Sequence, residues 1–434
     1  MRDAGCNFEM VESYRMSVHK LAAGVSGLLL VCLSGASHAT SDFQMRISAF
    51  GSIGSLPEED TLRSAFGEYY SDASADVRSL YEWNESGWEF ALHHQLIVRR
   101  GDLSTLDNAQ DDSLNSLPAG DDARAFDLSW GIDRGEEHAL WHRFDRASIG
   151  WSNRAWRVRL GRQALSWGNG LIFQPVDVLN PFSPVAVDTE YKPGDDMVLV
   201  EHRFSGGQEI QAIAVARRGQ DGDVAASSGS YGVRWHSPIN ASDLEAFAMR
   251  HYEEEIYGIG YSQPIGDLLL RGDLVLTSTR DGAHRVSAVI NSDATLSWGD
   301  TLVNLLLEYF YNGFGEDRPV LDSLRPALAE RLARGELVTA GKHYLAMSAV
   351  FTPDLRWNYG GLVLANLADS SMLVQLRATF LPSDFSSVDV GVTYSFGNDL
   401  GDEYRGLALS SDGAEEGMTS GGGARLYLRL ARYF

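Results

Sequence analysis

The sequence WRVRLGRQALSWGNGLIFQPVDVLNPFSP, residues 156–184, changes character at its middle. Up to residue 163 it alternates, with Trp156, Val158 and Leu160 on one side of an extended chain and Arg157 and Arg159 on the other. Side chains of a β-strand point alternately to opposite faces. Residues 156–163 are therefore predicted to form a strand with one apolar and one charged face.

From residue 164 onward the stretch contains several glycines and prolines but stays rich in Leu, Ile, Val and Phe. Proline fixes φ and lacks a backbone donor, so this part is not a central strand. Exposing so many apolar side chains to water is unfavourable. We therefore expect residues 166–184 to form a loop that folds back into the interior of a large barrel.

Residues 1–39 have the layout of a secretory signal peptide. Arg15 and Lys20 precede an apolar run over 21–33, and small residues end at Ala39, where cleavage is expected. An uncleaved anchor is the alternative. Residues 40–434 then form one domain, and no later run of about 18 apolar residues predicts a membrane helix. A β-barrel, whose strands need only one apolar face, is compatible with this pattern.

The composition excludes several classes of function. Cys6 and Cys32 both lie in the leader, so residues 40–434 have no cysteine for a disulfide or a thiolate metal site. The net charge of −23 argues against nucleic-acid binding, which requires a basic surface. Much of the acidity lies in 101–122 and 398–417, where it is either solvated loop charge or a loose divalent-cation site. We expect no cofactor.

Most of residues 40–434 can be divided into alternating segments, which predicts an all-β, transmembrane antiparallel barrel of about 16–18 strands. The predicted strands are 43–53, 87–99, 123–131, 142–151, 156–163, 196–204, 209–217, 231–236, 244–251, 256–263, 268–277, 285–291, 301–312, 343–352, 355–365, 372–381, 388–397 and 424–434.

The connections between these segments support a membrane barrel. Long connections at 54–86, 164–195, 313–342 and 398–423 follow odd-numbered strands, while most even-numbered strands end in short turns. Long loops at one end and short turns at the other are typical of outer-membrane barrels. Residues 101–122 are an exception, because this long connection follows the second predicted strand. A soluble propeller would show a repeat of about 40 residues, and none is present.

The last strand alternates and stops at Phe434. It resembles the terminal signal that the barrel-assembly machinery recognises in outer-membrane proteins, which predicts that machinery as a partner. Gly161-Arg162-Gln163, Trp167-Gly168 and Asn180-Pro181 resemble the corresponding motifs of porin-like outer-membrane families, and more distantly those of alginate-export-type barrels. Residues 308–313 and 365–369 show the same likeness. The resemblance implies a bacterial outer-membrane location, contact with lipids and lipopolysaccharide, and passage of small solutes.

Charged residues that alternate with apolar ones are assigned to the lumen, because charge on a lipid-facing side is costly. The predicted residues of the lumen and its constriction are Arg157, Arg159, Gln163, Asn169, Phe173, Asp177, Asn180, Arg203, Arg234, Arg271 and Arg377. The other charged residues assigned to the lumen are Arg425, Arg429, Glu201, Asp273, Glu308 and Asp389. Either these charges pair and brace the wall, or the arginines form a ladder that favours anions. Asp177 and Asn180 are expected to face Arg157 and Arg159.

No catalytic motif is present: the chain has no Gly-x-Ser-x-Gly and no His-Glu-x-x-His. We therefore expect a porin-like channel for small solutes, with a preference for anions if the arginines form a ladder, rather than an enzyme. An outer-membrane enzyme, or an adhesin or assembly scaffold on the same barrel, is the alternative. One helix is expected over 319–334, with its leucines packed toward the barrel mouth and Gly335 at its end.

Overall fold

The computed structural model describes residues 40–102, 121–135, 138–219, 221–397, 401–409 and 419–434. The predicted signal peptide and most of the two acidic loop segments lie outside these residues. No helix in the described part of the chain is long and apolar enough to cross a membrane.

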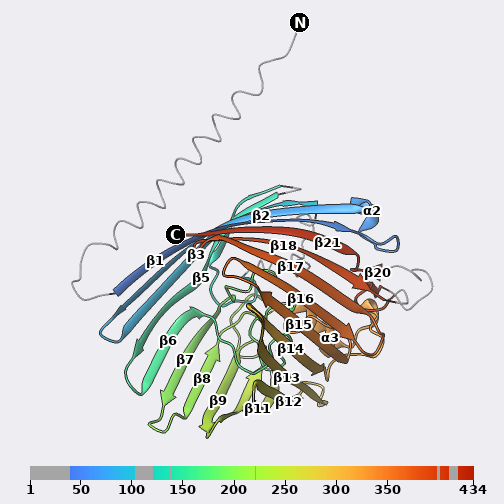
Figure 1. Cartoon of the computed structure of the whole chain (residues 1–434). Coiled ribbons are helices and arrows are strands. Elements are labelled where there is room, and N and C mark those ends of the chain that lie inside the picture. Colours follow the sequence, from blue (N-terminus) through green and yellow to red (C-terminus); the bar gives the residue numbers. More distant parts are fainter. Residues whose placement is uncertain (1–39, 103–120, 136–137, 220, 398–400, 410–418) are drawn as a thin grey trace.

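The chain forms an antiparallel sheet that closes on itself, because β1 pairs with both β2 and the last strand, β21 (Figure 1). The strands are β1 (Thr40–Ser55), β2 (Tyr69–Glu85), β3 (Trp88–Gly101), β4 (Ser129–Arg134), β5 (His138–Ser152), β6 (Trp156–Gln163), β7 (Asp195–Arg203), β8 (Glu209–Val215), β9 (Ser230–Ile239), β10 (Ser242–His251), β11 (Glu254–Ile265), β12 (Leu268–Ser278), β13 (His284–Trp298), β14 (Thr301–Tyr311), β15 (His343–Thr352), β16 (Trp357–Asn366), β17 (Met372–Ser383), β18 (Ser386–Phe396), β19 (Leu407–Ala408), β20 (Thr419–Ser420) and β21 (Ala424–Tyr433). The helices are α2 (Arg63–Phe66), the 3-10 helix η3 (Leu321–Ser323) and α3 (Pro326–Ala333).

The wall is an 18-strand closed barrel, which confirms the predicted fold class. The sequence analysis also divides the chain into 18 strands, but two of its segments are assigned wrongly. Residues 54–86 are not one long loop, because β2 pairs along its whole length with β1 and β3. Residues 123–131 do not form a wall strand either, since β4 begins at Ser129 and pairs with β5 alone.

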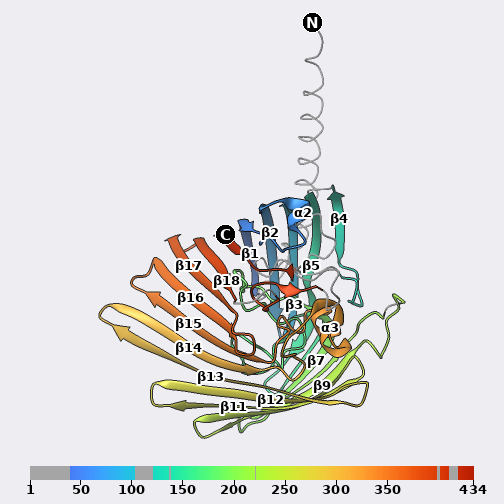
Figure 2. The same cartoon turned by 90° about the vertical axis from the view of Figure 1, so that its right-hand side faces the viewer.

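Placing β2 in the wall also removes the exception in the loop pattern. At one end of the barrel every connection is short, as at 86–87, 240–241 and 299–300, and the other end has only a few short turns, such as 252–253. The long connections, including 102–137, 164–194 and 312–342, all start from the other end. Figure 2 shows α3 at this second end, opposite the hairpin turns.

Outward-facing side chains are apolar along the strands and aromatic near both ends. Exposed aromatic residues near the short turns are Trp88, Trp151, Trp156, Tyr261, Trp298, Tyr359 and Phe385. Those near the long connections are Tyr69, Tyr231, Tyr257, Tyr394 and Phe396. Aliphatic residues such as Leu160, Leu274 and Ile290 are exposed between the two groups. An apolar band between two aromatic girdles is the outer face of a membrane barrel.

The wall is interrupted where β6 ends. Gly161 has φ +116°, and a Cβ there would lie 2.2 Å from the carbonyl oxygen of Ala147, so only glycine fits this position. The next residue, Arg162, is buried, and it forms ion pairs with Asp121 (2.8 Å) and Asp196 (2.9 Å). Residues 121–134 therefore close the gap beside β5 that the chain leaves as it turns into the lumen.

Candidate functional site

Residues 164–194, called here the lumen loop, cross the interior of the barrel between β6 and β7 (Figure 1). The indole Nε1 of Trp167 donates to Gln211 on β8 (2.8 Å). The backbone N and side-chain Nδ2 of Asn169 donate to Asp273 on β12 at 2.6 and 2.7 Å. Asn291 on β13 donates in turn to the carbonyl of Asn169 (3.0 Å). The first part of the loop is thus bound to one side of the wall.

The strongest attachment is made by Glu308 on β14, a fully buried carboxylate. It accepts the backbone N–H groups of Leu171 (2.8 Å), Ile172 (3.1 Å) and Phe173 (2.6 Å). Hydrogen bonds to a charged group contribute about 1.5–3 kcal/mol each. One wall carboxylate therefore fixes three consecutive residues of the loop.

The apolar residues of the loop pack against apolar residues that point into the barrel. Phe173 stacks on Phe310 with ring centroids 4.9 Å apart, and Val185 and Val187 belong to the same cluster. A second cluster contains Trp167, Val176, Val178 and Leu179 together with wall residues of β7, β8, β10, β11 and β12. The loop is buried inside the barrel, as its composition predicts.

The second part of the loop is attached by charge to the opposite side of the wall. Asp188 forms ion pairs with Arg46 on β1 (2.8 Å) and Arg429 on β21 (3.4 Å). Burial opposes ionisation of Asp188, but Arg429 and Arg46 hold the pKa of its carboxyl below its usual range. Glu190 adds contacts to both arginines (3.2 and 3.1 Å), and Gln375 on β17 donates to the carbonyl of Val185 (3.0 Å).

Tyr191 completes this attachment near β2 and β3. Its hydroxyl hydrogen-bonds to His93, and the guanidinium of Arg78 lies 3.6 Å from the centre of its ring. Arg146 on β5 lies 4.6 Å from the same ring and donates to the carbonyl of Lys192. The lumen loop therefore contacts strands around most of the barrel's circumference.

The expected contact of Asp177 and Asn180 with Arg157 and Arg159 is wrong. Asp177 pairs with Lys192 inside the loop itself, and burial raises the pKa of Asp177 and lowers that of Lys192. Asn180, which has φ +67°, hydrogen-bonds to Asp195. The loop folds on itself at this point, so its polar side chains serve its own conformation rather than a constriction opposite β6.

Most of the predicted lumen arginines are neutralised by acids on nearby strands. Arg157 binds Glu89 through two hydrogen bonds (2.8 and 2.6 Å), and Arg159 lies 3.6 Å from the same carboxylate. The other pairs join Arg203 to Glu201 (2.6 Å) and Glu209 (3.0 Å), Arg234 to Glu245, and Arg271 to Asp293 (2.5 Å). These contacts favour wall bracing over a free arginine ladder.

Arg377 on β17 differs from these five arginines. It has no acidic partner in ion-pair contact among the residues that the structure describes, and Arg429 takes the neighbouring Asp389 (3.2 Å). The strand positions paired with Arg377 are Gly360 and Gly391, which have no side chains, and the hydroxyl of Tyr427 occupies the space over Gly391. Gln163, another residue of the predicted constriction, is only 1% exposed. Its Nε2 donates to the carbonyl of Met197 on β7 (3.2 Å).

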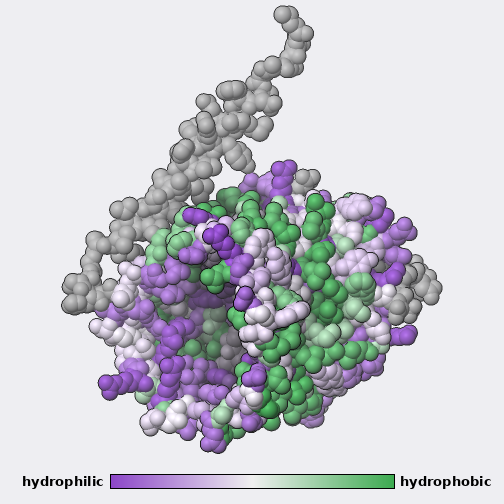
Figure 3. Space-filling view, viewed as in Figure 1, coloured by the Kyte–Doolittle hydropathy of each residue, from purple (hydrophilic) through white to green (hydrophobic). Residues whose placement is uncertain are grey.

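The end of the barrel with the short turns is open. Figure 3 shows a hollow there with a mainly hydrophilic wall, beside the hydrophobic band of the outer face. One cavity in this region, of about 250 Å³, is lined by Glu89, Arg157, Arg159 and Gln163 among others. A second, of about 420 Å³, is lined by Arg46, Arg78, Glu190 and Tyr191 among others. Sequence reasoning missed both arginines: Arg46 occupies an inward position of the predicted strand 43–53, and Arg78 lies on β2, which was predicted to be a loop.

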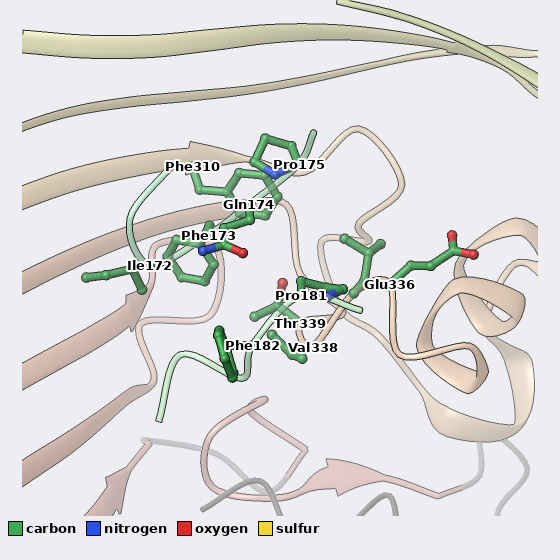
Figure 4. Close-up of a pocket in the computed structure, with 11 residues that line it drawn as sticks. Ile172, Phe173, Gln174, Pro175, Pro181, Phe182, Phe310, Glu336, Val338 and Thr339 are labelled. Carbon is green, nitrogen blue, oxygen red and sulfur yellow. The ribbon is translucent and has the colours of Figure 1, made fainter. Parts of the chain in front are cut away.

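At the other end the lumen loop meets the segment around α3. Figure 4 shows Ile172–Pro175 and Pro181–Phe182 beside Val338 and Thr339, with Glu336 next to them. The cavity between these segments is only about 20 Å³. Leu324, Leu328 and Leu332 pack in one cluster with Phe314 and Ala340 of the same segment, whereas Leu321, the fourth leucine of the predicted helix, is 41% exposed. The α-helix spans only Pro326–Ala333. Gly335 follows its last turn with φ +70°.

A buried Ser–His–Glu arrangement connects this segment to the wall. The Oγ of Ser230 lies 2.7 Å from Nδ1 of His251, whose Nε2 lies 2.9 Å from Glu336. Ser230 and His251 are 0% exposed, and Arg217 donates to the Ser230 Oγ (2.5 Å). A catalytic serine must be reachable by its substrate and free to attack. This arrangement is therefore a structural contact between the segment that follows α3 and strands β9 and β10.

Known proteins share the fold of this chain but little of its sequence. No family model and no curated protein matches it. OccAB2 and OccAB1 of Acinetobacter baumannii align with TM-scores of 0.53 and 0.52, at 10% and 12% identity, over 91% and 92% of this chain and 98% of each of theirs. Wzi, a carbohydrate-binding β-barrel involved in group 1 capsule assembly in Escherichia coli, aligns with a TM-score of 0.50 at 11% identity, over 89% of this chain and 83% of its own. The fold is that of a bacterial outer-membrane β-barrel.

Proposed function

We propose that this protein is an outer-membrane channel through which small polar solutes diffuse. The observation that carries the proposal is a hydrophilic lumen narrowed by a loop that is attached to the wall on several sides. A barrel of 18 strands encloses more space than wall side chains fill. The lumen loop, and not the wall alone, then sets the width of the path.

The charge preference of the channel is assigned to Arg377. The other five arginines of the predicted constriction are each matched by a carboxylate within a few ångströms, so their fields largely cancel. Arg377 lacks such a partner among the described residues and has glycines at the paired positions on both sides. An unmatched cation in a pore with low-dielectric walls attracts anions. We therefore propose a preference for small anionic solutes.

Membrane lipids, lipopolysaccharide and the barrel-assembly machinery are the other partners in this proposal. The outward apolar band contacts lipid, and Phe434 lies exposed at the end of the strand that closes the sheet.

The proposal is tested by reconstituting the refolded barrel in planar lipid bilayers. Heat-modifiable mobility in gels first verifies that the protein is folded. Ion current is then recorded across bilayers that separate different concentrations of salt or of a charged solute. We expect stepwise ion currents and a reversal potential that indicates anion preference. A folded barrel that inserts without producing current steps would contradict the channel function.

A further inference from the structure

A groove runs along the outer face of the barrel where its first and last strands meet. The register places Val390, Leu428, Gly51, Ala73 and Arg100 side by side in one row across β18, β21, β1, β2 and β3. The cavity above this row measures about 720 Å³ and also includes Ile53, Leu426 and Ser71. It lies at the level of the long connections.

The groove exists because β1 and β2 have no large outward side chain at Gly51 and Ala73, in the middle of this row. A Cβ built on Gly51 would have its nearest neighbour, the carbonyl oxygen of Asp72, 4.0 Å away, so the space above this strand is open. Ala73 and Ala75 continue the floor on β2, while Leu426 and Leu428 are 55% and 44% exposed and form one side. Other parts of the outer face carry larger aliphatic residues at such positions, for example Leu274 and Ile290.

An arginine stands at the other side of the groove. Arg100 is exposed on β3, and among the described residues it has no acid in ion-pair contact. Asp102, which lies nearby, accepts the backbone N–H of Ser71 (2.7 Å). An arginine on the lipid side is tolerated near the membrane surface, where its long stem lies on apolar surface and its guanidinium reaches polar groups.

We propose that this groove binds lipopolysaccharide, with one acyl chain over Gly51 and Ala73 and a lipid A phosphate on Arg100. The apolar floor and leucine side match a hydrocarbon chain in shape and polarity. The guanidinium matches phosphate, which it binds through two parallel hydrogen bonds. The site is on the outside of the wall, so it does not depend on the channel function.

The proposal is tested by native mass spectrometry of the detergent-solubilised barrel titrated with lipid A, dephosphorylated lipid A or phosphatidylcholine. Gly51→Leu with Ala73→Leu fills the groove, and Arg100→Gln removes the cation. Arg432→Gln, which changes an exposed arginine near the short turns, is the matched control. Heat-modifiable mobility verifies folding, and Ala73→Val alone replaces the double variant if that variant fails to fold.

We expect the wild-type barrel and Arg432→Gln to retain lipid A in preference to the other two lipids. Arg100→Gln should weaken lipid A binding about tenfold or more and remove the difference between phosphorylated and dephosphorylated forms. Filling the groove should weaken binding of both forms. Equal retention of all three lipids by the wild type, or unchanged lipid A binding in both variants, would overturn the proposal.

Discussion

The carboxylate of Glu308 on β14 accepts the backbone N–H of Phe173 at 2.6 Å, although the two residues are 135 positions apart in the chain. The same carboxylate also holds Leu171 and Ile172, and Phe173 stacks on Phe310 from the strand that carries Glu308. One strand thus supplies both the polar and the apolar attachment of the lumen loop.

Replacing this carboxylate should release the loop. In Glu308→Ala, three buried N–H groups lose their acceptor, which we expect to cost about 3 kcal/mol or more in free energy of unfolding. The loop should also become sensitive to limited proteolysis. Asp293→Ala is the control, because it removes a lumen carboxylate that pairs with Arg271 instead of the loop. Equal protection of the loop in both variants would show that Glu308 does not hold it.

Neutralising Arg377 should reduce anion preference. We expect Arg377→Gln to shift the reversal potential in a KCl gradient toward cations and Arg377→Lys to keep the wild-type value, because the latter retains the charge. The control is Arg271→Gln with Asp293→Asn, which neutralises both members of a pair and leaves the net charge unchanged. A shift in the control as large as that in Arg377→Gln would count against the special role of Arg377.

Acid should loosen the contact between α3 and the wall. Burial opposes ionisation of Glu336, but His251, Arg331 and Arg334 hold the pKa of its carboxyl at about 2. A depressed folded-state pKa means that the stabilisation is present above the unfolded-state pKa of about 4.3 and is lost as the pH falls toward 2.

Amide hydrogen exchange, corrected for the intrinsic rate at each pH, measures this effect. We expect protection of α3 to be constant above about pH 5 and to decline below it. Glu336→Gln should lower protection at neutral pH and flatten the profile. Glu330→Gln changes an exposed acid on α3 itself and should behave as wild type. A wild-type profile in Glu336→Gln would rule out this contact as the origin of the stabilisation.

Removing Phe434 should reduce assembly. Its backbone N–H donates to the carbonyl of Met45 (2.9 Å), so it extends the pairing of β21 with β1 that closes the barrel. An open sheet edge in lipid leaves backbone groups unpaired at several kcal/mol each. We expect less heat-modifiable barrel in cells after Phe434 is deleted or replaced by Asp, while Phe434→Tyr keeps the wild-type amount. If all variants give the wild-type amount of folded barrel, Phe434 has no role in assembly.

The wall was predictable wherever large apolar residues alternate with polar ones, as in Trp156–Gln163. It was not predictable for β2, because the outward residues Ser71, Ala73, Ala75 and Ser79 are too small or too polar to show the alternation. The same small side chains leave the groove on the outer face. The small outward residues of β2 thus explain both the missing alternation in the sequence and the groove on the outer face.

The site was predictable only in part. The inward positions of Asp273 and Glu308 follow from strand alternation, but their use as acceptors for the loop does not. A loop has no periodicity from which its path can be read, so the pairing of Asp177 with Lys192 was missed. Glu89 was missed as the partner of Arg157, because the two residues come from β3 and β6 and meet across β5.

Single-channel conductance of a loop-deleted barrel tests the central claim most directly. Residues 172–181 are removed, and a second variant replaces them with ten glycine and serine residues, which keeps the chain length but removes the apolar anchors. We expect the deletion to raise single-channel conductance above the wild-type value, and the replacement to give a fluctuating current because the loop no longer packs on the wall. Conductance equal to that of the wild type in both variants, with folding verified, would show that the lumen loop lies outside the conduction path.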